Sequence, residues 1–298
     1  MIGFNLNKAK RHFMEVLAEH YPQREAEQLM RILLEDLFDI DQKRQLMDPE
    51  MRIDEVEYSI LNDAVKWLLE GVPVQYVTRK AWFDGSLFYV DKSVLIPRPE
   101  TEGLVQRVAE ELASKAATER ILSDRPLRIW DVGTGSGCIA IALAKRLPSV
   151  EIMAFDVSEK ALVTAKMNVL LNEVEVKLVC DDVLHPQSEV WQQPVDLVVS
   201  NPPYIRESEK AFMESNVLDH EPHSALFVPD EDPLLFYRQI LSLAKPQLTP
   251  EGTVWFEINE ALGEEMALLG QKMGFDGKVY EDYNGKQRFA RFIDKPSW

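Results

Sequence analysis

A glycine-rich turn between an apolar strand and a helix constrains the fold of this chain more than any other sequence feature. Residues 127–130 are a short apolar run, residues 131–137 have the sequence DVGTGSG, and residues 138–147 follow a helical pattern. Glycine adopts backbone dihedrals that a side chain forbids, and it allows a ligand to approach closely. From residue 127 onward, predicted strands and helices alternate. This order is typical of an α/β protein with a mostly parallel sheet.

The spacing of the glycines argues against an ordinary dinucleotide site. Gly133, Gly135 and Gly137 lack the Gly-x-Gly-x-x-Gly spacing of that fingerprint. A second predicted strand, residues 150–156, ends in Asp156 about twenty residues after the turn, where doubly wound folds commonly place an acid on ribose hydroxyls. Alternatively, Asp156 is an ordinary residue at the start of the next helix. Taken together, the turn and the acid favour a nucleoside pocket.

A second polar turn follows the apolar run at residues 195–200, which predicts a short buried strand. Its sequence is Asn201-Pro202-Pro203-Tyr204. Each proline holds the preceding residue in extended geometry and lacks an N–H, so nearby carbonyls stay free to accept hydrogen bonds. The turn offers an amide oxygen, a carbonyl and a flat ring, which suits a planar NH2 group. Taken alone, these residues could form an ordinary loop with no role in binding.

The order of the strands predicts that the two turns meet. In an open α/β sheet, ligands bind beyond the carboxyl ends of the strands, where the strand order reverses. The glycine strand begins the unit, and the strands that end near Asp156 and Cys180 extend to one side. The strand before Asn201 begins the other side. We therefore expect the glycine turn and the Asn201 turn to leave neighbouring strands.

These motifs resemble those of class I S-adenosylmethionine-dependent methyltransferases, and more narrowly those of the bacterial release factor glutamine N5-methyltransferases. The resemblance spans most of the chain and is carried by residues 95–102 (LIPRPETE), 131–137, Asp156, 201–204 and 221–226 (EPHSAL). It implies a Rossmann-like, mostly parallel seven-stranded sheet with a C-terminal antiparallel hairpin, preceded by a small N-terminal helical bundle. The Asn201 tetrapeptide is shared with adenine and cytosine amino methyltransferases, so it specifies the acceptor group and not the molecule.

The resemblance also implies a reaction and its residues. The expected enzyme methylates the side-chain amide nitrogen of the glutamine in the Gly-Gly-Gln motif of release factors, converting S-adenosyl-L-methionine to S-adenosyl-L-homocysteine. The implied cofactor-binding residues are Gly133, Thr134, Gly135, Ser136, Gly137, Asp156, Asp182, Val183 and Asn201. The implied catalytic residues are Asn201, Pro202 and Tyr204, and the substrate-binding residues add Pro203, Arg98 and Glu102. A salt-bridged linker is the alternative role for Arg98 and Glu102. Val183 departs from the aromatic residue of the best-known members.

An amide acceptor explains why no strong base is expected. The nitrogen lone pair of an amide is delocalised into the carbonyl, with a rotation barrier of roughly 18–20 kcal/mol. We hypothesise that the Asn201 oxygen and the Pro202 carbonyl each accept one N–H of the substrate glutamine, and that Tyr204 packs against the amide plane. Orientation of the substrate amide and the preorganised dipoles of the turn would then supply much of the rate enhancement. No metal is expected.

The net charge of −17, from 33 basic and 50 acidic residues, favours a protein acceptor. Nucleic-acid binders concentrate lysine and arginine, so no direct nucleic-acid partner is expected. Three alternatives remain: a glutamine methyltransferase of a ribosomal protein, a DNA adenine or cytosine amino methyltransferase, and a non-enzymatic adaptor. The acidity weighs against DNA, and the presence of both Asn201 and Tyr204 weighs against an adaptor.

The expected location is the cytoplasm. No apolar stretch is long enough to span a bilayer, and the first residues lack a signal-peptide pattern. Cys138 and Cys180 lie in apolar settings, which favours a reducing compartment. The five histidines show no ligand spacing with the cysteines. A monomer is expected.

Three segments are predicted along the chain. Residues 1–72 form a helical bundle for substrate-protein recognition, residues 73–102 a β-hairpin linker around Asp84-Gly85, and residues 103–298 the catalytic domain. In the bundle, a helical stripe of predicted core positions comprises Ile53, Val56, Ile60, Ala64 and Leu68. The last strands, residues 274–280 and 287–293, are predicted to pair across a short turn. Residues 206–227 lack periodicity, and we expect an irregular loop that acts as a lid.

Overall fold

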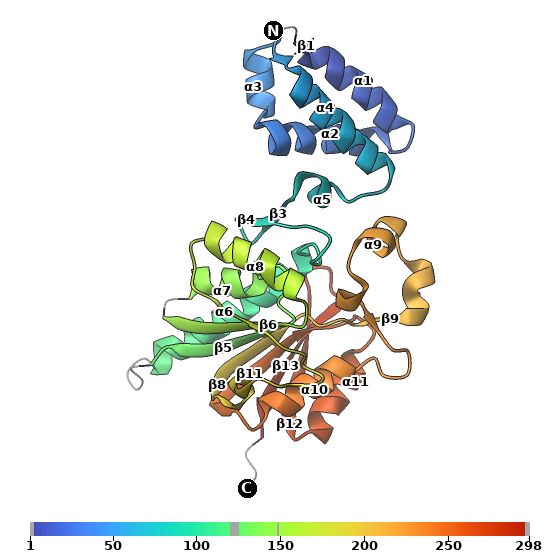
Figure 1. Ribbon diagram of the computed structural model, residues 1–298. Helices are drawn as coiled ribbons and strands as arrows, with labels where there is room; N and C mark the ends of the chain where they lie inside the picture. Colours follow the sequence, from blue (N-terminus) through green and yellow to red (C-terminus); the bar gives the residue numbers. More distant parts are fainter. Residues whose placement is uncertain (1–2, 120–124, 148, 296–298) are drawn as a thin grey trace. The chain divides into compact units, whose positions relative to one another are not determined.

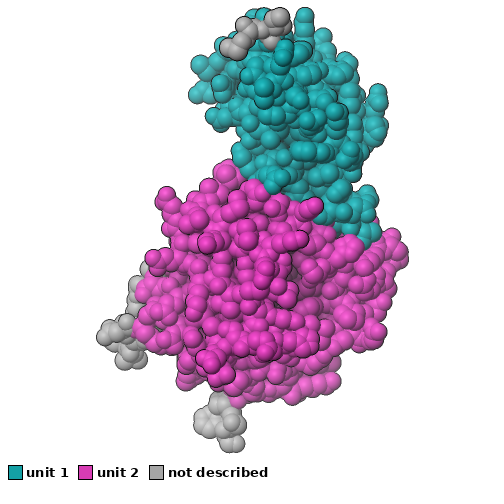
Figure 2. Space-filling view, in the orientation of Figure 1, with its two compact units in different colours: residues 1–80, 214–220 teal, residues 81–213, 221–298 magenta. Residues whose placement is uncertain are grey.

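The computed structural model describes residues 3–119, 125–147 and 149–295 (Figure 1). The chain divides into two compact units, which Figure 2 shows in different colours. The first unit comprises residues 1–80 together with 214–220, and the second comprises residues 81–213 together with 221–298. The segment 214–220 therefore belongs with the N-terminal unit, although it lies far from that unit in the sequence.

The first unit is a helical bundle. Its elements are β1 (Phe4–Asn5), α1 (Leu6–Ala18), α2 (Gln23–Phe38), α3 (Gln42–Met47), β2 (Arg52–Ile53), α4 (Glu55–Leu69), α5 (Val74–Thr78) and α9 (Ser215–His220). Helix α4 begins at a capping box, in which Asp54 accepts from the Glu57 backbone N–H and the Glu57 carboxylate accepts from the Asp54 backbone N–H. Tyr21, in the connection between α1 and α2, donates to the Leu68 carbonyl and joins this connection to α4. An N-terminal helical bundle is thus present.

The predicted core stripe of this bundle is partly wrong. Val56 and Ile60 are 66% and 44% exposed. The buried face of α4 consists of Leu61, Ala64, Val65 and Leu68. Helix α4 carries apolar side chains on more than one face, and its contacts with α1 and α2 select the face that is buried. Periodicity alone does not make that choice.

The N-terminal segment of the first unit extends to Lys80, eight residues beyond the predicted end of the bundle at residue 72. The difference comes from α5, which contacts both α2 and α4. The predicted hairpin follows, with β3 (Lys80–Phe83) and β4 (Ser86–Tyr89). Its turn residues have positive φ, 49° at Asp84 and 70° at Gly85, as a two-residue type I′ turn requires.

The second unit contains a seven-stranded sheet with the order β12-β13-β11-β8-β5-β6-β7. Its strands are β5 (Leu127–Val132), β6 (Val150–Asp156), β7 (Lys177–Cys180), β8 (Val195–Ser200), β11 (Leu248–Glu257), β12 (Phe275–Glu281) and β13 (Gln287–Asp294). Strand β13 pairs antiparallel with β11 and β12, and the other neighbours pair parallel. The predicted fold class and the C-terminal antiparallel hairpin are confirmed.

Helices cover both faces of the sheet (Figure 1). One face carries α6 (Pro99–Glu119), α7 (Cys138–Arg146) and α8 (Glu159–Leu171), and the other carries α10 (Leu235–Ala244) and α11 (Gly263–Lys272). Under α10 and α11, Tyr237 and Phe256 pack edge to face in one apolar cluster. Trp130, on β5, lies in the same cluster and packs edge to face on Phe155 and Trp191. A bulky residue under the glycine turn is thus accommodated by neighbouring rings.

The segment predicted as an irregular loop contains short regular elements. They are β9 (Ile205–Arg206), η2 (Glu207–Phe212), α9, η3 (His223–Ala225) and β10 (Phe227–Val228), while η1 (Glu189–Gln192) lies before β8. Strands β9 and β10 pair parallel, with Ile205 opposite Phe227. This pairing joins the two ends of the segment. A lid function stays a prediction. Over the described ranges, none of the helices has the length and apolar character needed to cross a membrane.

Candidate active site

The two predicted turns leave neighbouring strands of the sheet. Strands β5 and β8 pair parallel, with Val132 opposite Ser200. The Ser200 hydroxyl donates a 2.5 Å hydrogen bond to the Val132 carbonyl, which joins the two carboxyl ends. The glycine turn starts at the residue after Val132, and Asn201 follows Ser200. The expectation that these turns lie on adjoining strands is confirmed.

The glycine turn folds back onto β6. The backbone N–H groups of Gly133 and Thr134 donate to the Phe155 carbonyl at 2.8 and 2.9 Å. Gly133, Gly135 and Gly137 all have positive φ, so the turn requires glycine for conformational reasons. A Cβ at Gly133 or Gly135 would meet no atom within 4 Å, so the surface beside these residues is open to a ligand.

Asp131 lies buried beneath this turn. Its Oδ2 accepts from the Thr134 hydroxyl at 2.6 Å and from the Ala140 N–H at 3.2 Å. Its Oδ1 is buried and has no hydrogen-bond partner among the described residues. Burial raises the pKa of Asp131 to about 7. Buried polar atoms are usually paired, so an orphan carboxylate oxygen suits a cationic group of a ligand. Asp131 is not among the predicted site residues, although its place two residues before Gly133 was a usable signal.

Asp156 connects the end of β6 to the glycine turn. Its Oδ2 accepts from the Gly135 N–H at 2.9 Å, and its Oδ1 accepts from the Ser158 N–H at 2.9 Å. Ser158 caps α8 by accepting from the Ala161 N–H. Asp156 thus contacts the start of the helix, as the alternative reading expected. Each carboxylate oxygen keeps a second lone pair, so ribose hydroxyls can also be bound. The ribose role stays a prediction.

Asp182 and Val183 lie in the turn that follows β7. Asp182 accepts from the Leu184 N–H at 2.9 Å and contacts His185 Nδ1 at 3.0 Å. Val183 packs against the apolar cluster that contains Trp130. The carboxylate therefore shapes the turn, and Val183 supplies an aliphatic surface at the position predicted to flank adenine.

A hydrogen-bonded chain holds the acceptor turn. Asn201 Nδ2 donates to Thr101 Oγ1 at 3.2 Å, and the Thr101 hydroxyl donates to Glu257 Oε2 at 2.7 Å. Tyr204 donates from its hydroxyl to Glu257 Oε1 at 3.3 Å. Glu257 is 1% exposed, and burial raises its pKa, while the Thr101 hydrogen bond acts in the opposite direction. Sequence reasoning missed Thr101 and Glu257 as parts of the site, because no local pattern links residues on α6 and β11.

Arg98 and Glu102 make internal contacts. Arg98 Nη2 lies 2.6 Å from Glu221 Oε1, and Glu221 Oε2 accepts from the Ile96 N–H at 3.2 Å. This ion pair joins the segments 95–102 and 221–226. Glu102 accepts from the Asp84 N–H at 2.9 Å. These contacts fit the linker alternative, and a direct role of either residue in substrate binding stays a prediction.

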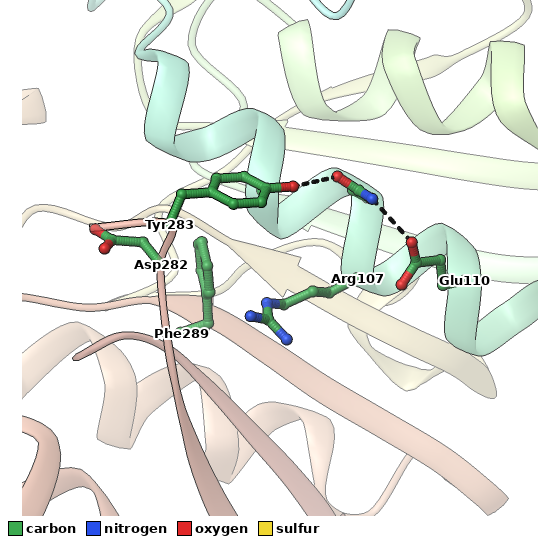
Figure 3. Close-up of a pocket in the computed structure, with 7 residues that line it drawn as sticks. Arg107, Glu110, Asp282, Tyr283 and Phe289 are labelled. Carbon is green, nitrogen blue, oxygen red and sulfur yellow. Dashed lines mark hydrogen bonds between the residues drawn. The ribbon is translucent and has the colours of Figure 1, made fainter. Parts of the chain in front are cut away.

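A separate hollow lies between α6 and the β12–β13 turn (Figure 3). Tyr283 donates to Gln106 Oε1 at 2.6 Å, and Gln106 donates to Glu110 Oε1 at 2.9 Å. The Arg107 guanidinium lies 5.3 Å from the centre of the Phe289 ring. None of the predicted site residues lines this hollow. In the described part of the chain there is no cluster of three or more His, Cys, Asp or Glu side chains able to hold a metal.

The sheet order, the glycine turn after β5 and the Asn-Pro-Pro-Tyr turn after β8 together define a class I methyltransferase fold. Comparison with solved structures supports this class. The catalytic domain of hMettl16 superposes with a TM-score of 0.50 at 15% identity, over 70% of this chain and 76% of that one. At this identity the likeness concerns the fold alone. A model of the methyltransferase small domain matches residues 110–221.

Sequence comparison narrows the class to one family. Residues 8–78 match the PrmC N-terminal domain. The release factor glutamine methyltransferase of Flavobacterium psychrophilum is 40% identical over 94% of this chain and 95% of its own length. The protein of the same name from Bacteroides thetaiotaomicron is 37% identical over 95% of this chain and 98% of its own length. This chain therefore belongs to the release factor glutamine methyltransferase family.

Proposed function

We propose that this protein transfers a methyl group from S-adenosylmethionine to the side-chain amide nitrogen of a glutamine in a peptide-chain release factor. The observation that carries the proposal is the junction of β5 and β8, where the glycine turn and the Asn201 turn begin side by side. The family relatives, which are named for this reaction, support the same acceptor.

The residues around the glycine turn fit the cofactor. The backbone at Gly133 and Gly135 offers an open surface for its methionine portion, and the orphan Oδ1 of Asp131 suits its ammonium group. Asp156 would accept from the ribose hydroxyls, with Asp182 and Val183 beside the adenine. When bound, the cofactor supplies an electrophilic methyl group on a sulfonium centre.

The acceptor turn would fix the glutamine amide. Asn201 Oδ1 and the Pro202 carbonyl each accept one N–H, and Pro203 keeps the turn extended. Tyr204 packs against the amide plane, with its hydroxyl held by Glu257. Both N–H groups are then occupied, so the nitrogen is presented to the methyl group in one orientation. Positioning of this kind replaces a strong base.

The proposal includes a cytoplasmic location and a monomeric enzyme with no nucleic-acid partner. Cys138 and Cys180 are free thiols, which suits a reducing compartment. The net charge of −17 suits a protein acceptor better than a phosphate backbone. Light scattering would measure the oligomeric state directly.

Methyl-transfer assays test the acceptor. The protein is incubated with labelled S-adenosylmethionine and, in separate reactions, with release factors, ribosomal proteins or duplex DNA. We expect label only in release factors, and mass spectrometry should place the methyl group on the Gly-Gly-Gln glutamine. Label on a ribosomal protein or on DNA, with none on release factors, would refute the proposal.

Asn201→Ala tests the acceptor turn. Loss of one preorganised polar partner typically lowers turnover by about 10²–10³-fold. The variant should therefore lose turnover while its circular dichroism spectrum and thermal unfolding show an intact fold. Asn284→Ala, an exposed residue in the turn between β12 and β13, is the matched control and should behave as wild type. Wild-type turnover in a folded Asn201→Ala variant would show that the site is wrong.

A further inference from the structure

Asn201 can accept a hydrogen bond from the substrate only if the oxygen of its side-chain amide, and not the nitrogen, faces the substrate. The carboxamide has an acceptor oxygen and a donor NH2 group of nearly the same shape. The substrate glutamine presents its own NH2 group. If Asn201 presented nitrogen as well, two donors would face each other and no hydrogen bond could form. The site therefore needs a device that holds the Asn201 oxygen on the substrate side.

Thr101 provides the first part of such a device. Asn201 Nδ2 donates to Thr101 Oγ1 at 3.2 Å, so the nitrogen end of the amide is directed toward α6. A hydroxyl has one proton and can also donate. The Thr101 hydroxyl therefore accepts consistently from Asn201 Nδ2 only if its own proton is donated to a different group.

Glu257 provides the second part. Thr101 donates to Glu257 Oε2 at 2.7 Å, and an ionised carboxylate only accepts hydrogen bonds. The carboxylate thus fixes the direction of the Thr101 proton, and that direction fixes Asn201. Thr101 and Glu257 are 2% and 1% exposed, so water does not readily substitute for either partner.

We propose that Thr101 and Glu257 form a polarity relay that keeps the Asn201 oxygen, rather than its nitrogen, toward the acceptor amide. The relay rests on the proposed function, since it deepens the role given there to Asn201. Thr101 and Glu257 are positioning residues, because they act on the substrate only through Asn201 and Tyr204.

Protonation of Glu257 would reverse the relay. A neutral carboxyl gains a proton to donate, and Thr101 would then donate to Asn201, which would turn its nitrogen to the substrate. The charged and titratable groups that face Glu257 are Glu100 from α6, Cys138 from α7, Arg288 from β13 and Tyr204 after β8, and Tyr237 from α10 donates to its backbone carbonyl. Arg288 favours the ionised form, and Glu100 opposes it. Turnover should therefore fall on the acid side as Glu257 gains a proton.

The first experiment uses the full-length protein without substrate. Asparagine is labelled with ¹⁵N, and the Asn201 side-chain signal is identified by its loss in Asn201→Asp. Exchange of its amide protons with water should be slow in wild type and in Thr101→Ser, which keeps the hydroxyl. It should be fast in Thr101→Val, which has the same shape and no hydroxyl. Equal exchange in Thr101→Val and wild type overturns the relay.

The second experiment measures methyl transfer to a release factor. Thr101→Val should lower kcat by about 10- to 100-fold, because hydrogen bonds to charged groups are worth about 1.5–3 kcal/mol. KM should change little, and Thr101→Ser should restore kcat. Thr253→Val is the matched control, since Thr253 is buried on β11, as Glu257 is, and its hydroxyl has no partner in the described part of the chain. This control should keep the wild-type kcat.

Glu257→Gln keeps the relay testable if Thr101→Val fails to fold. The glutamine amide can either accept from Thr101 or donate to it, so the direction of the Thr101 proton is no longer fixed and kcat should be lower than in wild type. Because the amide does not titrate, the acidic limb of the kcat profile should disappear. A wild-type kcat and an unchanged pH profile in Glu257→Gln would overturn the relay. If wild type methylates no release factor while the exchange results come out as expected, the relay stands and the proposed acceptor fails.

Discussion

At the scale of single residues, Asp131 is the titratable group with the clearest consequence for stability. It is fully buried, it accepts two hydrogen bonds through one oxygen, and its other oxygen is orphaned. The two hydrogen bonds favour the ionised form, but desolvation outweighs them and raises the pKa from 3.8 to about 7. The free protein therefore carries a carboxyl group that ionises with difficulty until a cation is near.

Asp131→Asn should remove one pH-dependent part of the stability. The folded state holds this proton more tightly than the unfolded state, so the associated stability is complete below pH 3.8 and is lost as the pH rises to about 7. A rise of this size corresponds to roughly 4 kcal/mol at most. Urea unfolding from pH 4.5 to 8 should show a smaller decline in the variant than in wild type. Parallel declines would show that Asp131 is not the group that titrates.

At the scale of elements, the start of α6 links the β3–β4 hairpin to the site. Glu102 accepts from the Asp84 N–H in the hairpin turn, and Arg146 on α7 binds the Asp84 carboxylate. One residue before Glu102, Thr101 contacts Asn201. The hairpin thus contacts the same first helical turn of α6 that contacts Asn201.

Substitution of Glu102 distinguishes a linker role from substrate contact. Glu102→Gln keeps an oxygen acceptor for the Asp84 N–H and should behave as wild type. Glu102→Ala should lower the free energy of unfolding by about 1 kcal/mol, the usual size of one hydrogen bond, and leave KM for the release factor unchanged. Chemical denaturation and steady-state kinetics measure the two effects. A raised KM with unchanged stability would instead favour direct substrate contact.

At the scale of the whole molecule, charge is the dominant property. With 50 acidic and 33 basic residues, the protein attracts basic surfaces within the Debye screening length of the solution. Attraction of this kind speeds encounter with a partner more than it strengthens the final complex. We therefore expect the release factor to present a basic face.

Ionic strength should change KM for the release factor and leave kcat unchanged. Between about 0.05 and 0.5 M salt, KM for the release factor should rise several-fold, since exposed charges beyond roughly 10 Å are screened. kcat should stay constant, because the hydrogen bonds proposed between the turn at residues 201–204 and the acceptor amide act at short range, where salt screens little. Methylation kinetics at several salt concentrations give both values. A KM that does not respond to salt would remove the electrostatic hypothesis.

Much of the catalytic fold could be predicted because its signals are local. The strands at residues 150–156 and 195–200 occur with the predicted bounds, since turn residues limit each apolar run. The Thr101–Glu257 contact could not be predicted, because it joins residues 156 positions apart: Thr101 lies in the motif at residues 95–102, but no local pattern pairs that motif with Glu257. The same limit explains Val56 and Ile60, whose exposure depends on which face of α4 meets its neighbours.

The membership of α9 in the first unit has a consequence for biosynthesis. This helix comes from residues 215–220, and its His220 contacts the Glu70 carbonyl. During translation, the bundle therefore cannot be completed until α9 has been synthesised, after strands β5 to β8 of the catalytic sheet. A fragment cut at residue 80 deprives α9 of its packing partners, so limited proteolysis followed by separation should yield pieces less stable than the intact chain.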